Sequence, residues 1–294
     1  MKLGLSSYSF RPMLVDGQLT VDGMFDWLRE NGAEHLEIAT FSFAKRGTEA
    51  NYDLASEEET LRQLEAASAR TNIPISGFCM AANFLGSDSE RRAQIENVKR
   101  YVDLCQRFGA GFLRHDVVPW HLRPSTEEFE REFAVIADAS REVAEYGAAH
   151  GVVTSVEDHG FFMNSSERVL RLIHAVNNPN FRFTLDVGNF LCVDEDPHVA
   201  TRRSLPFASF VHLKDFYVRR TEPGPGWLET AGGQFIRGSV FGFGDLDTKG
   251  LIESVVASGY DGFVSLEYEG NEPTLYGCEV GLNNIRRMLD EVRG

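Results

Sequence analysis

The sequence predicts an α/β protein built as a single eight-fold (β/α)8 barrel, a TIM barrel, over residues 1–294. Short apolar runs alternate with longer amphipathic segments, which is typical of a parallel sheet with right-handed crossovers. Eight such units in 294 residues match a closed barrel. An open doubly wound sheet is the alternative, but it usually carries a glycine-rich phosphate turn after its first strand, and residues 6–10 contain no such turn.

The expected strands are the short apolar runs. In chain order they cover residues 2–8, 35–39, 74–79, 111–115, 152–157, 181–186, 210–214 and 262–267.

The expected helices have apolar residues at spacings of three and four, as Ile95, Val98 and Val102 illustrate. Gly109 follows that segment directly and is a good helix stop. In chain order the helices are expected near residues 21–31, 57–71, 89–108, 126–150, 166–176, 197–205, 248–258 and 282–292.

One long segment, residues 215–244, departs from this alternation. It is rich in glycine, includes Pro223, Pro225 and Trp227, and shows no helical pattern. Loops of this length are uncommon and are often functional. We interpret it as a loop insertion beside the barrel mouth that acts as a lid, with an oligomer contact or a mobile loop as the alternative.

Composition and charge narrow the function. A net charge of −15 repels phosphate backbones, which argues against a nucleic-acid partner. Cys79, Cys105, Cys192 and Cys278 lack metal-finger spacing and are expected to be reduced, packed thiols of a cytoplasmic protein, with a disulfide pair as the alternative. The first residues lack the apolar stretch of a signal peptide, and no apolar run approaches about 18 residues, so we expect no membrane span.

Four of the expected strands end in a residue that can bind a divalent metal: Glu157, Asp186, His212 and Glu267. They recur at about the length of one strand–helix unit, with the long segment added before the last, and the carboxyl ends of neighbouring barrel strands converge on one mouth. Each residue alone has a structural alternative, such as a helix cap. Together they would repel one another without a cation, and oxygen-rich ligation with one histidine suits Mn²⁺, Co²⁺ or Mg²⁺ and accepts Zn²⁺. We therefore expect one divalent ion, with Mn²⁺ as first choice.

The segments around these residues resemble those of the sugar phosphate isomerase/epimerase superfamily, the xylose isomerase-like TIM barrels. The similar segments are Glu157-Asp158-His159-Gly160, Leu185-Asp186-Val187-Gly188-Asn189, His212-Leu213-Lys214-Asp215, Gly242-Phe243-Gly244-Asp245-Leu246-Asp247 and Ser265-Leu266-Glu267-Tyr268-Glu269. The resemblance implies metal ligands at Glu157, Asp186, His212 and Glu267. In the ketose 3-epimerases of the family the two glutamates also form an acid/base pair, which implies catalytic roles for Glu157 and Glu267.

The implied activity is isomerisation or epimerisation of a small carbohydrate. The metal would stabilise an enediolate formed when a proton next to the carbonyl leaves, and one glutamate would remove that proton while the other returns one. A keto-sugar or keto-inositol dehydratase (a lyase) on the same metal site is the nearest alternative. A non-catalytic sugar-binding barrel and a hydrolase similar to apurinic endonucleases fit less well, since the ligand set is complete, and the latter needs several more histidines and a basic face.

Three residues near the ligands are candidate substrate contacts. His159 lies two residues after Glu157 and would contact substrate or orient a ligand, with a loop hydrogen bond as the alternative. Lys214 shares one side of its strand with His212, and would neutralise a substrate oxyanion or phosphate or pair with a carboxylate. Asn189 stands where the resembling epimerases place a substrate-binding histidine.

Two further candidates, His115 and Glu37, end their strands and face the mouth only if the strand register holds, since a slip of one residue turns a side chain away. The phosphorylation state of the substrate also stays open. A glycine-rich phosphate cradle is not evident, which favours a free sugar or polyol, although residues 242–244 offer backbone N–H groups.

Overall fold

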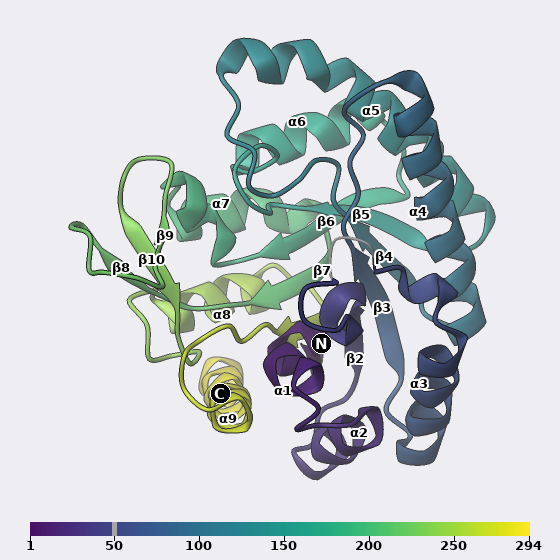
Figure 1. Cartoon of the computed structure of the whole chain (residues 1–294). Helices are drawn as coiled ribbons and strands as arrows, with labels where there is room; N and C mark the ends of the chain where they lie inside the picture. Colours follow the sequence, from purple (N-terminus) through teal and green to yellow (C-terminus); the bar gives the residue numbers. More distant parts are fainter. Residues whose placement is uncertain (49–51) are drawn as a thin grey trace.

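The computed structural model describes residues 1–48 and 52–294, and it confirms the predicted closed barrel (Figure 1). The strands pair in parallel in the closed order β1-β11-β7-β6-β5-β4-β3-β2. Their bounds are β1 (Lys2–Ser6), β2 (Leu36–Ala39), β3 (Ile75–Met80), β4 (Phe112–His115), β5 (Val153–Glu157), β6 (Phe181–Asp186), β7 (Ala208–Leu213) and β11 (Phe263–Leu266).

Helices surround the barrel and connect its strands (Figure 1). The α-helices are α1 (Arg11–Val15), α2 (Val21–Glu30), α3 (Glu58–Thr71), α4 (Asp88–Phe108), α5 (Thr126–Ala149), α6 (Ser166–Val176), α7 (Pro197–Ser204), α8 (Thr248–Ala257) and α9 (Thr274–Arg293). Short 3-10 turns add η1 (Ser7–Phe10), η2 (Thr40–Phe43), η4 (Leu54–Ser56), η5 (Asn189–Val193) and η6 (Leu205–Phe207).

Several element boundaries differ from the sequence prediction, and two of the differences have a clear physical reason. The first strand ends at Ser6, and the residues up to Phe10 form η1 because the Ser6 hydroxyl accepts the Tyr8 N–H and turns the chain. Helix α9 begins eight residues before the predicted start at residue 282. Its early glycines look like helix breakers in the sequence, but Gly277 lies where any side chain would collide with the Tyr268 ring. Close packing on the barrel therefore explains that glycine.

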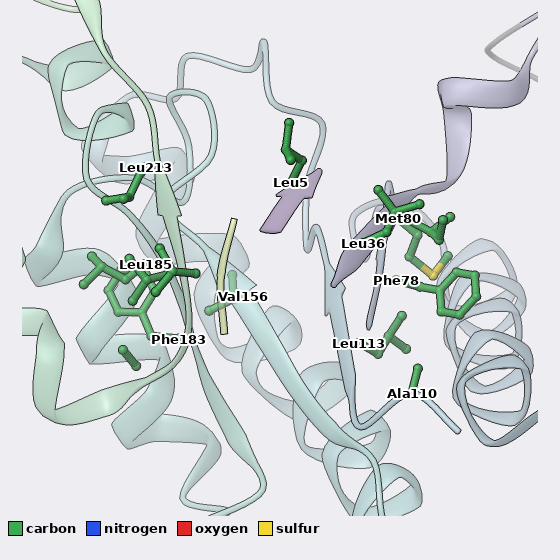
Figure 2. Packing of buried hydrophobic residues seen from close by; sticks show 14 of the residues in the cluster. Leu5, Leu36, Phe78, Met80, Ala110, Leu113, Val156, Phe183, Leu185 and Leu213 are labelled. Atoms are coloured by element: carbon green, nitrogen blue, oxygen red, sulfur yellow. The ribbon is translucent and has the colours of Figure 1, made fainter. Parts of the chain in front are cut away.

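The strands present two different faces. Alternate side chains point outward and pack against the helices, as Phe78 does on Phe108 of α4 and as Figure 2 shows for Phe78, Leu113 and Leu185. The interior side chains form layers. Phe112, Phe210 and Phe263 contact one another as an aromatic floor, with ring centroids 5.7–5.9 Å apart. The polar residues of the mouth lie above this floor.

The long segment after β7 contains a small antiparallel sheet, which the sequence prediction of a loop insertion did not include. It contains β8 (Phe216–Arg219), β9 (Leu228–Glu229) and β10 (Phe235–Gly238) in the order β8-β10-β9, and it projects beside the barrel (Figure 1). These strands are too short for a clear period-two pattern. One face of the sheet, with Phe216 and Ile236, packs on Phe161 and Cys192 of the neighbouring mouth loops.

The four cysteines are buried and free, as predicted. In residues 1–48 and 52–294, no helix has both the length and the apolar character needed to cross a bilayer.

Candidate metal centre

The four predicted ligands meet at the carboxyl ends of adjacent strands. Glu157 ends β5, Asp186 ends β6, His212 lies near the end of β7, and Glu267 directly follows β11. All four side chains are buried, and one ligand atom from each lies within 4.8 Å of the others. Residues separated by more than a hundred positions thus share one small volume because parallel strands end at the same rim.

Two atoms of this cluster fit a bound cation. Asp186 uses its Oδ1 atom to accept the N–H groups of Gly188 (2.8 Å) and Asn189 (3.0 Å). Its Oδ2 atom and the Nδ1 atom of His212 are buried and have no hydrogen-bond partner within the described residues. Buried polar atoms are normally satisfied, so three carboxylates and an imidazole with two unsatisfied atoms fit a divalent ion.

Glu37 lies behind the histidine rather than at the open mouth. Its Oε2 atom is 2.7 Å from His212 Nε2, and both side chains are buried. Burial lowers the pKa of His212, but the charges of Glu37 and Glu267 raise it well above its usual value, so a bound metal would displace a proton from Nδ1. In the neutral form that a metal ligand needs, a proton on Nε2 donated to Glu37 leaves the Nδ1 lone pair directed at Asp186 and Glu157, whose carboxylate oxygens are 3.9 and 3.8 Å away. Such a carboxylate–histidine pair fixes the tautomer of a metal ligand. The geometry therefore gives Glu37 an orienting contact with His212.

Arg114 is a mouth residue that sequence reasoning missed. It lies on β4, points into the barrel, and its Nε atom is 2.6 Å from Glu157 Oε2. The same guanidinium lies 2.9 Å from Asp116 and donates to Cys79 Sγ. The side chain is almost fully buried. The Nε atom makes no hydrogen bond within the described residues, so the contact between Arg114 and Glu157 is a buried ion pair.

His115, the neighbour chosen from the sequence, points away from the mouth. Its ring lies between Phe84 and Phe181, with centroid distances of 5.6 and 6.0 Å, and its Nδ1 atom is 2.9 Å from the Asp116 carbonyl oxygen. The predicted substrate contact is therefore not among the residues gathered at the mouth. The reason is the alternation of the strand, which directs Arg114 inward and His115 outward.

Lys214 lies inside the acidic cluster. Its Nζ atom is 2.7 Å from Glu267 Oε2, 3.5 Å from Asp186 Oδ2 and 3.7 Å from Glu269 Oε1. It also donates to Asn189 Oδ1 (3.3 Å), while Asn189 Nδ2 donates to Glu157 Oε1 (2.8 Å). Glu269 was missed in the sequence, although it lies two residues after Glu267, a spacing that could have revealed it.

The ion pairs decide the protonation states of the two glutamates. Burial alone raises the pKa of Glu157, but the Arg114 charge lowers it to well below the usual value. Burial likewise raises the pKa of Glu267, and Lys214 and His212 lower it further than burial raises it. Burial lowers the pKa of Lys214, whereas the charges of Asp186 and Glu267 raise it well above normal. Both glutamates are therefore held as carboxylates, the form that binds a cation or accepts a proton.

His159 lies at the edge of the cluster. Its Nδ1 atom is 3.0 Å from Asp116 Oδ1, and its side chain is 33% exposed. The Trp120 ring lies 6.5 Å away, and 45% of this residue is exposed. Asp116 joins His159 to Arg114, so these three residues form one connected group beside Glu157.

The fold and the cluster define a class of protein: a (β/α)8 barrel with a buried carboxylate–histidine cluster, able to hold a metal ion, at the carboxyl ends of its strands. The family model described as the xylose isomerase-like TIM barrel matches residues 25–288, and the chain belongs to this family.

Known relatives agree with this assignment. L-ribulose-5-phosphate 3-epimerase UlaE of Escherichia coli is 25% identical over 242 residues, which cover 78% of this chain and 79% of the relative. Solved structures with the same fold include the probable 3-DHS dehydratase AsbF of Bacillus anthracis, with a TM-score of 0.73, 20% identity, and coverage of 97% of this chain and 99% of that chain. A xylose isomerase-like TIM barrel protein of Mycobacterium smegmatis in complex with magnesium has a TM-score of 0.70, 16% identity, and coverage of 93% and 89%. The relatives thus include an isomerase-type enzyme, and the fold is shared with a dehydratase.

Proposed function

We propose that this protein is a divalent-metal-dependent sugar isomerase or epimerase that works by proton abstraction next to a carbonyl. The observation that carries the proposal is the buried cluster of Glu157, Asp186, His212 and Glu267, in which two atoms lack partners among the described residues and both glutamates are held ionised. The epimerase relative supports the same reaction type.

The four cluster residues would hold the ion, which we propose to be Mn²⁺, with Co²⁺, Mg²⁺ or Zn²⁺ as alternatives. When bound, the ion supplies positive charge that stabilises negative charge developing on the carbonyl oxygen of the substrate. Arg114 forms a buried ion pair with Glu157, and Glu37 keeps the His212 ring in place with Nδ1 directed at the cluster.

The chain's own residues carry the proton. One of Glu157 and Glu267, each an unprotonated base, accepts the C–H proton beside the carbonyl and leaves an enediolate. The other first takes a proton from water and delivers it to the opposite face of the same carbon in an epimerisation, or to the adjacent carbon in an isomerisation, while the first glutamate releases its proton to water. Lys214 has three N–H donors and lies close to Glu267 and Asn189, and we propose that it also donates to a substrate oxyanion.

A keto-sugar or keto-inositol dehydratase is the second candidate, and a specific observation favours it. The Asp116–His159 pair adds a third acid/base group at the partly exposed edge of the site. Elimination of a β-hydroxyl needs an acid to protonate the departing oxygen, which an imidazolium held by a carboxylate can supply. The products of the reaction separate the two candidates.

The test follows C–H exchange in D₂O by NMR with the Mn²⁺-loaded protein and a panel of ketoses and keto-polyols. We expect deuterium incorporation next to the carbonyl, and a fall of ~10²–10⁴-fold in Glu157→Gln and Glu267→Gln, the usual contribution of an acid/base residue. Bound Mn²⁺ is measured in each variant, so that loss of the ion is distinguished from loss of the base. His115→Phe is the matched control, since His115 packs outside the mouth. Exchange that persists unchanged in both glutamine variants would contradict the mechanism.

A further inference from the structure

Trp120 is an exposed aromatic residue at the rim of the barrel mouth. It lies in the loop between β4 and α5, and 45% of the residue is exposed. An isolated exposed apolar residue is common on protein surfaces and needs no function. Two observations distinguish Trp120: it stands where the acidic cluster opens to solvent, and its backbone is held in place by a neighbouring loop.

The side chains that lead from the cluster to Trp120 become more exposed step by step. Glu157 is 3% exposed, and it contacts Arg114. Asp116 is 10% exposed and contacts the same guanidinium, and His159, which is 33% exposed, contacts Asp116. The Trp120 ring follows, with its centroid 6.5 Å from that of the His159 ring. The cluster therefore opens to solvent on this side, and Trp120 stands at the outer end of the opening.

His159 borders the space that a substrate must enter. Burial raises the pKa of Glu157, Arg114 lowers it, and a protonated His159 lowers it further. Burial also raises the pKa of Glu269, whereas the charges of Lys214 and His159 lower it. An imidazole that acts on carboxylates of β5 and of the loop after β11 lies toward the middle of the mouth. Trp120 is thus the neighbour of a residue that faces the site.

The backbone under the indole ring is fixed by the loop after β5. The Trp120 carbonyl oxygen accepts the Phe161 N–H (3.0 Å). Gly160 has a φ of +74°, and a Cβ atom there would collide with the Trp120 carbonyl group. A positive φ and a close backbone approach both favour glycine. The two loops therefore hold Trp120 in one place, although its side chain remains in contact with water.

Polar groups border the indole ring. The His121 ring lies 5.8 Å away, nearly perpendicular to the indole, and the residue is exposed. His159 contacts Asp116 through Nδ1, and its Nε2 atom makes no hydrogen bond to the residues that the structure describes. A pyranose ring has the matching chemistry, since its C–H groups form an apolar face and its hydroxyls form a polar edge. Aromatic contact with a few polar groups at the border is how protein sites hold such ligands.

A protein partner matches this surface less well. Stable protein interfaces cover about 800 Å² on each partner and have an apolar centre. The other large hydrophobic residues exposed in residues 1–48 and 52–294 are Val199, Phe243 and Tyr276, on α7, in the loop before α8 and on α9. None of them belongs to the loop that carries Trp120. The exposed indole is therefore a small apolar surface, about the size of one ring, with polar groups around it.

We infer that Trp120 forms an outer subsite, and that the substrate carries a second sugar ring, which stacks on the indole while the reacting ring lies at the cluster. The inference rests on the proposed function, which places the reacting sugar at Glu157 and Glu267, and it narrows the substrate class to keto-sugars joined to another sugar. His159 lies between the two positions, and its Nε2 atom bonds hydroxyls of either ring.

The first test compares one-ring and two-ring sugars by calorimetry with the Mn²⁺-loaded protein. D-fructose is compared with turanose, maltulose and isomaltulose, in which a glucosyl ring is attached at three different oxygen atoms of the same ketose. D-glucose with maltose and cellobiose is a second series. We expect at least one disaccharide to bind ~10-fold or more tightly than its monosaccharide, the scale of burying one face of a ring. Disaccharides that bind no more tightly than the monosaccharides would overturn the inference.

The second test locates the gain in affinity. Trp120→Ala should remove the ~10-fold advantage of the disaccharide and leave monosaccharide affinity unchanged, while Trp120→Phe, which keeps an aromatic face, should retain most of it. The hydrogen bond to Phe161 uses the backbone of Trp120, so both variants keep it. Trp227→Ala is the matched control, because Arg237 and Arg219 lie over that ring at 4.6 and 5.7 Å. Equal losses for one-ring and two-ring sugars in Trp120→Ala would contradict the subsite.

The outcomes separate this inference from the proposed function. Disaccharide binding that depends on Trp120, without C–H exchange in any ketose, would count against the proposed function and keep the subsite. Exchange in D-fructose together with no gain from a second ring would keep the proposed function and overturn the inference. Sedimentation of the wild-type protein and Trp120→Ala adds one more outcome: dissociation of an oligomer in the variant would assign the indole to a subunit interface and overturn the subsite.

Discussion

Lys214→Met should make the metal-free protein less stable and the metal-binding site tighter. The Lys214 ammonium lies 2.7 Å from Glu267 and 3.5 Å from Asp186, and all three side chains are nearly or fully buried. Removing one partner of a buried ion pair costs ~3–5 kcal/mol, since the remaining charge is left uncompensated. A divalent ion bound by the same carboxylates would relieve that penalty. The free-energy cost of the uncompensated carboxylates therefore falls on the metal-free state alone. If Mn²⁺ binding removes ~3 kcal/mol of this cost, the variant binds Mn²⁺ ~10²-fold more tightly than the wild-type protein.

Mn²⁺ titration by calorimetry measures the affinity, and urea unfolding with and without EDTA measures the stability of the two states. Lys249→Met is a matched control because Lys249 forms an exposed pair with Glu291 (2.9 Å), and such pairs contribute little. An unchanged or weaker Mn²⁺ affinity in Lys214→Met would refute the view that this ammonium competes with the ion for the carboxylates.

The remaining predictions concern the two sequence candidates that the structure places elsewhere. Glu37→Gln should weaken Mn²⁺ binding by ~10–100-fold, because His212 loses the anion that orients it, and the same titration would contradict this if the affinity were unchanged. His115→Phe should reduce the loss of stability in acid. Burial lowers the pKa of His115 to about 4, so the unfolded chain, with a pKa of ~6.5, binds the proton first. Stability is thus fully present above pH ~6.5 and falls by ~2 kcal/mol per such histidine down to pH ~5. Urea unfolding at these pH values should therefore show a loss in the variant that is smaller by ~2 kcal/mol than the loss in the wild-type protein, which keeps both His115 and His35, a histidine whose pKa burial also lowers to about 4. An equal loss of unfolding free energy in the wild-type protein and the variant would refute the view that burial lowers the pKa of His115.

The small sheet after β7 illustrates where sequence patterns fail. Its strands contain two to four residues each, too few to show alternation, and glycine and proline lie between them. Tertiary contacts stabilise the small sheet. The Asp215 carboxylate accepts backbone N–H groups of residues 242–246, and Phe216 and Ile236 pack on residues from other mouth loops. Its role as a lid stays a prediction.

The sequence by itself determined the barrel and the gathering of the four predicted ligands. Strand and helix periods recur along the chain, and any closed parallel barrel brings the strand ends Glu157, Asp186, His212 and Glu267 to one rim. Predicting that these four residues lie together does not require the direction of each side chain, because each residue was chosen for its position at the end of a strand.

Only the tertiary structure decided which neighbours of those ligands enter the mouth. Adjacent residues of a strand point in opposite directions, so one position separates Arg114, which holds Glu157, from His115, which packs among aromatic rings. Glu37 is distant in sequence from His212, and their contact exists only because the barrel closes. The occupied N–H groups around Asp215 likewise follow from a chain reversal that no local pattern encodes. The strand ends determine where the site lies. Strand register, barrel closure and loop packing depend on contacts between residues far apart in the sequence, and these determine which side chains surround the site.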